Sequence, residues 1–115
     1  MFGIQWTEEA AGTYSTLRDA AELARTNREK KKIEKASKQE GLFKQVVKCI
    51  DLLASNPRPT GLHTHEYDSL THPYDPGQKV FEAYVQNKTP GAYRVFWCYG
   101  PNQKEITIIA ITPHP

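Results

Sequence analysis

The sequence predicts a single α+β domain, in which two helices precede a three-stranded antiparallel meander. Three runs rich in Val, Ile, Tyr, Phe and Thr lie between residues 79 and 113, and short breaks with Gly, Pro and Asn separate them. Before them, apolar residues recur at three- and four-residue spacing over two stretches, as they do in amphipathic helices. A chain of 115 residues is expected to form one domain, residues 1–115, around one core.

The N-terminal segment predicts a short edge strand followed by a helix. Residues 2–6 alternate between apolar and smaller or polar side chains. Thr7 is a suitable N-cap, and Glu8 and Glu9 complement the positive end of the helix dipole. The face that this helix buries is predicted to contain Tyr14, Leu17, Ala21 and Ala24.

Residues 25–39 are rich in Lys and Arg and lack an apolar stripe. Ile33 is their only large apolar side chain, and the basic residues outnumber Glu29 and Glu34. One interpretation is a solvated turn or hairpin tip. The other is a basic arm that contacts phosphate groups, because clustered Lys and Arg release counterions from nucleic acid. In the second case the substrate-binding candidates are Lys30, Lys31 and Lys32.

The second helix is predicted to begin after Gly41, which we interpret as a helix break. Its apolar stripe consists of Leu42, Val46, Cys49, Ile50 and Leu53. The helix ends at Asn56-Pro57, because proline cannot continue a helix and disfavours helical geometry in the residue before it.

The segment 62–76 contains His63, His65 and His72, and part of it, residues 65–70, is a candidate strand. The histidine spacing matches no standard zinc pattern, and no cysteine is close in sequence, so we expect neither a metal site nor a cofactor. The remaining interpretations are half-exposed side chains beside a strand, donors to phosphate, or a proton-transfer group, since imidazole titrates near neutrality.

The alternation of the meander places Glu82 and Arg94 on adjacent strands. Arg94 is the only cation in an otherwise apolar and aromatic run, where a guanidinium is costly to bury without an anionic partner. Two interpretations follow. Arg94 forms a cross-strand ion pair with Glu82, or it faces an open concave surface and binds a phosphate.

Composition excludes several classes of protein. No apolar run is long enough to span a membrane, and the N-terminus lacks the basic and apolar regions of a signal peptide, so a cytoplasmic protein is expected. Cys49 and Cys98 fall in apolar patterns and are expected to be reduced core residues. The net charge of +2 predicts no partner by itself.

Three local patterns, together with the order of the predicted helices and strands, resemble the RelE/ParE superfamily of toxins from bacterial type II toxin–antitoxin systems. The patterns are IDLLASNPRPTGL at residues 50–62, FEAYV at 81–85 and GAYRVFW at 91–97. With the aliphatic last strand they cover most of residues 42–113. The resemblance implies a curved antiparallel sheet of three or four further strands, with the N-terminal strand and a helical hairpin packed against it.

For function, the resemblance implies a toxin that a cognate antitoxin neutralises. RelE-like members cleave mRNA on the ribosome through attack of a ribose 2′-hydroxyl on the neighbouring phosphate, which needs a base, an acid and cations. ParE-like members instead inhibit DNA gyrase without a nuclease site. A third possibility is a relative that keeps the fold and has lost toxicity.

The resemblance assigns candidate roles residue by residue. Arg94 matches the phosphate-stabilising arginine of the nucleases, and Glu82 matches the glutamate of the preceding strand. Tyr84 occupies a position where the family commonly has arginine. His114 is the nearest candidate acid or base after the last strand, where family nucleases usually continue with a basic residue and a tyrosine. The other candidate donors are His63, His65, Lys79 and Lys88.

Overall fold

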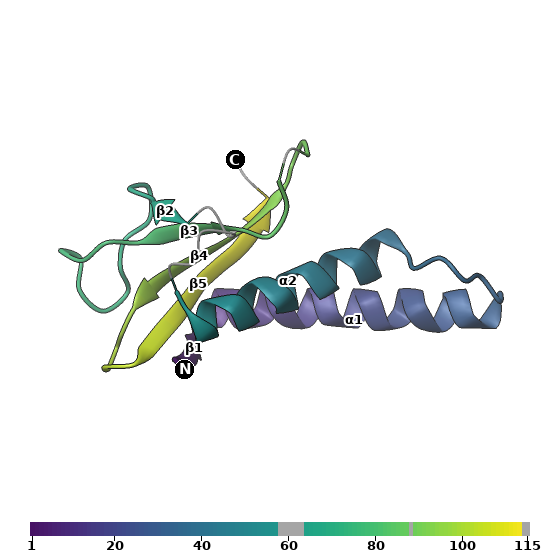
Figure 1. Ribbon diagram of the computed structural model, residues 1–115, viewed down its shortest axis with the longest axis horizontal. Helices are drawn as coiled ribbons and strands as arrows, with labels where there is room; N and C mark the ends of the chain where they lie inside the picture. Colours follow the sequence, from purple (N-terminus) through teal and green to yellow (C-terminus); the bar gives the residue numbers. More distant parts are fainter. Residues whose placement is uncertain (58–63, 88, 114–115) are drawn as a thin grey trace.

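The computed structural model describes residues 1–57, 64–87 and 89–113, and the helices pack against one face of an open sheet (Figure 1). The elements in chain order are β1 (Gly3–Trp6), α1 (Glu8–Lys30), α2 (Lys38–Ser55), β2 (His65–Glu66), β3 (Phe81–Tyr84), β4 (Tyr93–Tyr99) and β5 (Glu105–Pro113). The strands form one sheet in the order β1-β5-β4-β3-β2. The predicted α+β class and the β3-β4-β5 meander are confirmed.

The sheet is mixed rather than purely antiparallel, because β1 runs parallel to β5. All other neighbouring strands are antiparallel. β1 is an edge strand, as predicted, and β2 forms the opposite edge. The predicted strand at residues 65–70 is limited to His65–Glu66, because the chain turns away from the sheet after Tyr67, whose N–H donates to the carbonyl of Val80 at 2.8 Å.

Helix α1 begins as predicted and continues further than its apolar stripe. The Thr7 hydroxyl accepts the N–H of Ala10 at 3.1 Å and lies 2.7 Å from the carbonyl of Ile109, so the N-cap also ties the helix to β5. Ala10 and Ala21 are buried. The helix runs on to Lys30, so the hairpin of α1 and α2 extends well beyond the sheet (Figure 1).

The predicted helix break at Gly41 is wrong, because Gly41 lies within α2. The chain reverses earlier, between Lys30 and Lys38, and α2 starts with a capping box. The Ser37 side chain accepts the N–H of Glu40, and the Glu40 carboxylate accepts the N–H of Ser37 at 2.7 Å. This reciprocal pair satisfies two backbone donors and outweighs the propensity cost of one helical glycine, about 1 kcal/mol.

The main core lies between the helices and the sheet. Val46, Cys49 and Leu53 of α2 are almost completely buried, as the predicted stripe requires. They are in one cluster with apolar side chains of β3, β4 and β5, among them Phe81, Val95, Trp97, Ile106 and Ile108. Phe81 and Trp97 stack with their ring centroids 4.8 Å apart.

A second apolar cluster lies on the outer face of the sheet, the face opposite the helices. It contains Val80, Phe96, Cys98, Ile109 and Ala110. A β-bulge beside Phe96 and Trp97 interrupts the register between β4 and β5. Tyr67 covers part of this cluster, with its ring centroid 4.6 Å from that of Phe96.

His72 anchors the segment that follows β2 and is 5% exposed. Its Nδ1 accepts the N–H groups of Tyr74 and Asp75, so the ring proton is on Nε2, which donates to the carbonyl of Tyr99 at 2.8 Å. His72 is therefore a structural histidine that fixes this segment against the end of β4.

Both cysteines are buried free thiols, as predicted. In the described part of the chain, no helix has the length and apolar character needed to cross a membrane.

Candidate functional site

Four candidate site residues meet on the outer face of the sheet, where β2, β3 and β4 lie side by side. They are His65, Glu82, Tyr84 and Arg94. The register places His65 opposite Glu82 and Tyr84 opposite Arg94. Residues of one strand that are two apart share a face, so Glu82 and Tyr84 present neighbouring side chains.

His65 and Glu82 form an ion-pair contact in which the two groups differ strongly in exposure. Nε2 of His65 lies 2.8 Å from Oε1 of Glu82. The Glu82 side chain is only 2% exposed, whereas the His65 side chain is 49% exposed. The buried carboxylate therefore holds an imidazole that solvent can reach.

Arg94 is held by Tyr84 and by two backbone carbonyls. Its guanidinium carbon lies 3.7 Å from the centroid of the Tyr84 ring, a cation–π contact. Nη1 donates to the carbonyl of Gln86 at 2.6 Å and to its own neighbour Tyr93 at 3.1 Å. The residue is 7% exposed. These contacts satisfy the hydrogen-bonding capacity of Nη1, just beyond the end of β3.

The alternative of a cross-strand ion pair between Glu82 and Arg94 is wrong. The register puts Arg94 opposite Tyr84 and puts Glu82 opposite Phe96, so the two charged side chains are diagonal neighbours. The carboxylate of Glu82 takes His65 as its partner, and Arg94 takes an aromatic ring and carbonyl oxygens. Sequence alone did not reveal the contribution of Gln86, which supplies a backbone carbonyl.

The Tyr84 ring lies between His65, which contacts Glu82, and the guanidinium of Arg94. Its centroid lies 5.9 Å from that of His65 in an edge-on arrangement, while Arg94 covers the ring. The site is therefore a continuous row of buried carboxylate, exposed imidazole, half-buried phenol and buried guanidinium. Such a row offers one accessible proton-transfer group beside a fixed positive charge.

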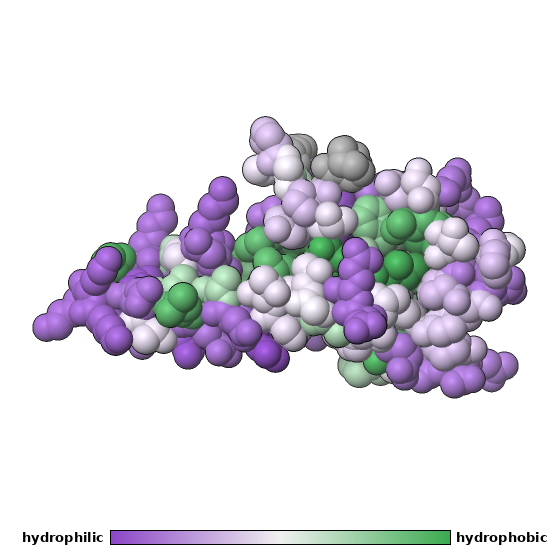
Figure 2. All heavy atoms as spheres, turned by 180° about the vertical axis from the view of Figure 1, so that it is seen from behind, coloured by the Kyte–Doolittle hydropathy of each residue, from purple (hydrophilic) through white to green (hydrophobic). Residues whose placement is uncertain are grey.

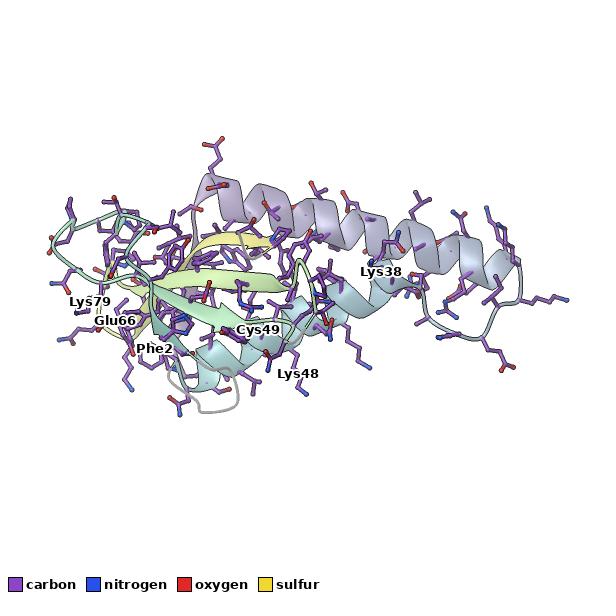
Figure 3. The ribbon with its side chains drawn as sticks, turned by 90° about the horizontal axis from the view of Figure 1, so that it is seen from above. Phe2, Lys38, Lys48, Cys49, Glu66 and Lys79 are labelled. Atoms are coloured by element: carbon purple, nitrogen blue, oxygen red, sulfur yellow. The ribbon has the colours of Figure 1, made fainter. Side chains whose placement is uncertain are left out.

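The other candidates lie elsewhere. Lys79 and Glu66 form an exposed ion pair of 3.0 Å at the sheet end of the molecule (Figure 3). Lys30, Lys31 and Lys32 lie in or beside the hairpin turn, at the opposite end from β2 and β3 (Figure 1). His63, Lys88 and His114 lie outside the described residues. Within the described residues, no three His, Cys, Asp or Glu side chains are grouped as metal ligands would be.

This arrangement is an open five-stranded sheet with a helical hairpin on one face and a polar row on the other, and two solved structures share it, which makes the fold RelE/ParE-like. The chain is similar to the YoeB/ParE toxin from Agrobacterium tumefaciens, with a TM-score of 0.59, 10% identity, and coverage of 98% of this chain and 99% of that one. It is also similar to a chain of the archaeal RelE-RelB complex from Pyrococcus horikoshii OT3.

For that second structure the TM-score is 0.56 and the identity 14%, over 97% of this chain and 93% of that one. No protein-family model and no curated protein matches the sequence. The RelE/ParE-like fold that the local patterns predicted is confirmed over nearly the whole chain. At 10% and 14% identity, the similarity establishes the fold.

Proposed function

We propose that this chain is the toxin of a type II toxin–antitoxin system and that it cleaves mRNA on the ribosome, in the cytoplasm. The fold is that of a solved structure described as a YoeB/ParE toxin and of a chain of a RelE-RelB complex. The single observation that favours cleavage is the 2.8 Å contact between the exposed imidazole of His65 and the buried carboxylate of Glu82.

In the proposed reaction, His65 takes the proton of a ribose 2′-hydroxyl. The 2′-oxygen attacks the adjacent phosphorus, and the bond from phosphorus to the 5′-oxygen of the next nucleotide breaks. The products are a 2′,3′-cyclic phosphate and a 5′-hydroxyl, completed by a solvent proton. Glu82 stabilises the imidazolium that forms, and the guanidinium of Arg94 contributes positive charge to the site.

Burial gives Arg94 a different role from the one implied by the family resemblance. A residue that is 7% exposed and donates Nη1 to two carbonyls offers little surface to a phosphate. We assign Arg94 a positioning role, in which it orders the Tyr84 ring beside His65. Tyr84 and His65 are then the groups that contact RNA.

A gyrase inhibitor of ParE type is the second candidate, and the same burial of Arg94 favours it. Tyr84 stands where the family commonly has an arginine, and Arg94 turns its Nη1 towards backbone carbonyls. A non-enzymatic toxin needs neither residue as a phosphate ligand.

One experiment separates the candidates. The purified chain is incubated with programmed ribosomes and, separately, with DNA gyrase and plasmid. We expect cleavage of ribosome-bound mRNA, reduced at least about 100-fold by His65→Ala and unchanged by the exposed control Lys104→Ala. Inhibited supercoiling without cleavage would establish the second candidate. The absence of both effects, together with normal growth on expression of the chain, would favour a fold relative without toxicity.

The proposed partner is an antitoxin, since one of the similar structures is a RelE-RelB complex. Growth arrest on expression of the chain should be relieved by co-expressing the product of the adjacent gene. Arrest that persists with every neighbouring gene would contradict the proposed pairing.

A further inference from the structure

The positive charge of the molecule is concentrated in residues 25–38, which comprise the end of α1, the hairpin turn and the first residue of α2, and which we call the basic tip. Seven Lys and Arg and only two Glu occur there, for a net charge of +5. The whole chain carries +2, so the remaining residues together carry −3. The molecule is therefore strongly asymmetric in charge, although its net charge is small.

The lysines of the basic tip are exposed, and no described carboxylate forms an ion pair with them. Among the described residues, the ion pairs at this end involve the arginines, with Arg25 3.9 Å from Glu29 and Arg28 2.9 Å from Glu40. The exposed lysines without a carboxylate partner are Lys30, Lys31, Lys32, Lys35 and Lys38. Their charges remain available to an external anion.

The turn that carries these lysines is held in one conformation by Arg28. Its Nε and Nη2 donate to the Glu40 carboxylate, and Nη1 donates to the carbonyls of Ile33 and Glu34. The hydrogen bond from Arg28, followed by that from the Ser37 N–H, lowers the pKa of Glu40 to about 2, so this clamp is intact at neutral pH. The backbone of the tip is thus ordered before any ligand binds, which reduces the entropy cost of binding.

The basic tip projects far from the candidate site. With 23 residues, α1 is about 35 Å long, and the turn lies at the end of the molecule opposite β2 and β3 (Figure 1). Lys38 is on the hairpin side and Lys79 on the sheet side (Figure 3). From behind, hydrophilic side chains cover the hairpin end and hydrophobic ones are isolated there (Figure 2).

We infer that the basic tip binds the phosphate backbone of folded RNA while the outer face of the sheet acts on a second segment. The inference rests on the proposed function for the choice of RNA. Protein-binding surfaces are enriched in aromatic anchors, and residues 25–38 contain none. Membrane-binding surfaces combine basic residues with an apolar face, whereas Ile33 is the single large apolar residue of the tip.

The test compares two variants with the same net charge. The tip variant carries Lys30→Gln, Lys31→Gln and Lys32→Gln, and the control variant carries Lys44→Gln, Lys48→Gln and Lys104→Gln. Both are made in the full chain with His65→Ala, so that RNA is not cut, and their thermal unfolding is compared with that of the parent. Binding to an RNA hairpin with a duplex stem is followed by fluorescence anisotropy at several salt concentrations.

We expect the tip variant to bind at least about tenfold more weakly near 0.1 M salt, with a shallower dependence of log K on log salt concentration, by up to about 0.9 for each phosphate contact removed. The control variant should bind like the parent. Equal weakening in both variants, weakening in neither, or tip-dependent binding to anionic lipid vesicles but not to RNA would overturn the inference.

The RNA-binding test of the basic tip can fail independently of the mRNA-cleavage test of the proposed function. A chain whose tip binds RNA but which does not cleave ribosome-bound mRNA would contradict only the nuclease. The three tip substitutions are therefore also made in the chain that keeps His65: if that chain cleaves mRNA, and the tip variant binds ribosomes as tightly as the control variant, only the role of the basic tip would be contradicted.

Discussion

Nε2 of His65 lies 2.8 Å from Oε1 of Glu82, and the two residues occupy directly opposite positions of β2 and β3. The carboxylate is buried below the sheet surface, and the imidazole stands half exposed above it. A fixed carboxylate that contacts one ring nitrogen restricts the orientation of the imidazole.

Glu82→Gln should lower kcat for mRNA cleavage by about 10–100-fold and leave KM nearly unchanged, because the amide still packs in place but no longer stabilises the imidazolium. Single-turnover cleavage at saturating ribosome concentration measures the effect. A raised KM with unchanged kcat would instead assign Glu82 to substrate binding.

Arg94→Ala should destabilise the fold by about 2–4 kcal/mol, because it removes hydrogen bonds to two carbonyls and the cation–π contact with Tyr84. Urea unfolding monitored by circular dichroism gives the value. Arg94→Lys keeps the charge and should recover only part of the loss, since one ammonium cannot reproduce the planar stack. A loss below about 0.5 kcal/mol, the size expected of a surface substitution, would show that Arg94 has no positioning role.

Leu53→Ala and Leu52→Ala form a matched pair in α2. Leu53 is 0% exposed and lies in the main core, whereas Leu52 is 39% exposed. We expect losses of about 2–5 kcal/mol for Leu53→Ala and under about 1 kcal/mol for Leu52→Ala. Similar losses in both variants would mean that α2 packs with a different face towards the sheet.

Acid should weaken the hairpin through Glu40. Its pKa is lowered from the ordinary value of 4.5 to about 2 in the folded chain, chiefly by the hydrogen bond from Arg28. Its stabilising contribution is therefore complete above about pH 4.5 and is lost as the pH falls towards 2. Thermal unfolding between these pH values should depend less on pH in Glu40→Gln than in the parent, whereas the exposed control Glu34→Gln should follow the parent.

The two thiols should be unreactive in the folded protein. Burial raises the pKa of Cys49 to about 12 and, with a partly opposing hydrogen bond from the backbone of Thr107, that of Cys98 to about 11. At pH 8 almost no thiolate is present to attack a disulfide reagent. Both thiols should react rapidly in guanidinium chloride and slowly in buffer. Fast reaction of either one in buffer would indicate local opening of its cluster.

Much of the fold could be predicted because its signals are local. The Thr7 cap, the apolar stripe of α2 and the alternation along β3 and β4 are each encoded within a few residues. The helix α2 starts at the capping box of Ser37 and Glu40, which is a stronger start signal than the glycine at position 41. That signal was present in the sequence.

The pairing within the candidate site could not be predicted, because it depends on register between strands that no tight turn connects. His65 reaches Glu82 through a strand of two residues, with the segment anchored by His72 between β2 and β3. The partner of Arg94 depends on the register of β3 and β4, where a shift of one residue reverses every side chain. The observed register pairs Arg94 with Tyr84 and so excludes the ion pair with Glu82 that strand alternation alone allows.

The parallel pairing of β1 with β5 joins residues about a hundred positions apart, as the hydrogen bond between Gln5 and Glu105 shows. During synthesis, residues 3–6 leave the ribosome long before their neighbour in the sheet exists. The five-stranded surface is therefore assembled late, when β5 has emerged, and until then the edge of β4 that β5 will occupy stays unpaired. The sheet, and with it the outer face, can therefore be completed only after β5 has been translated.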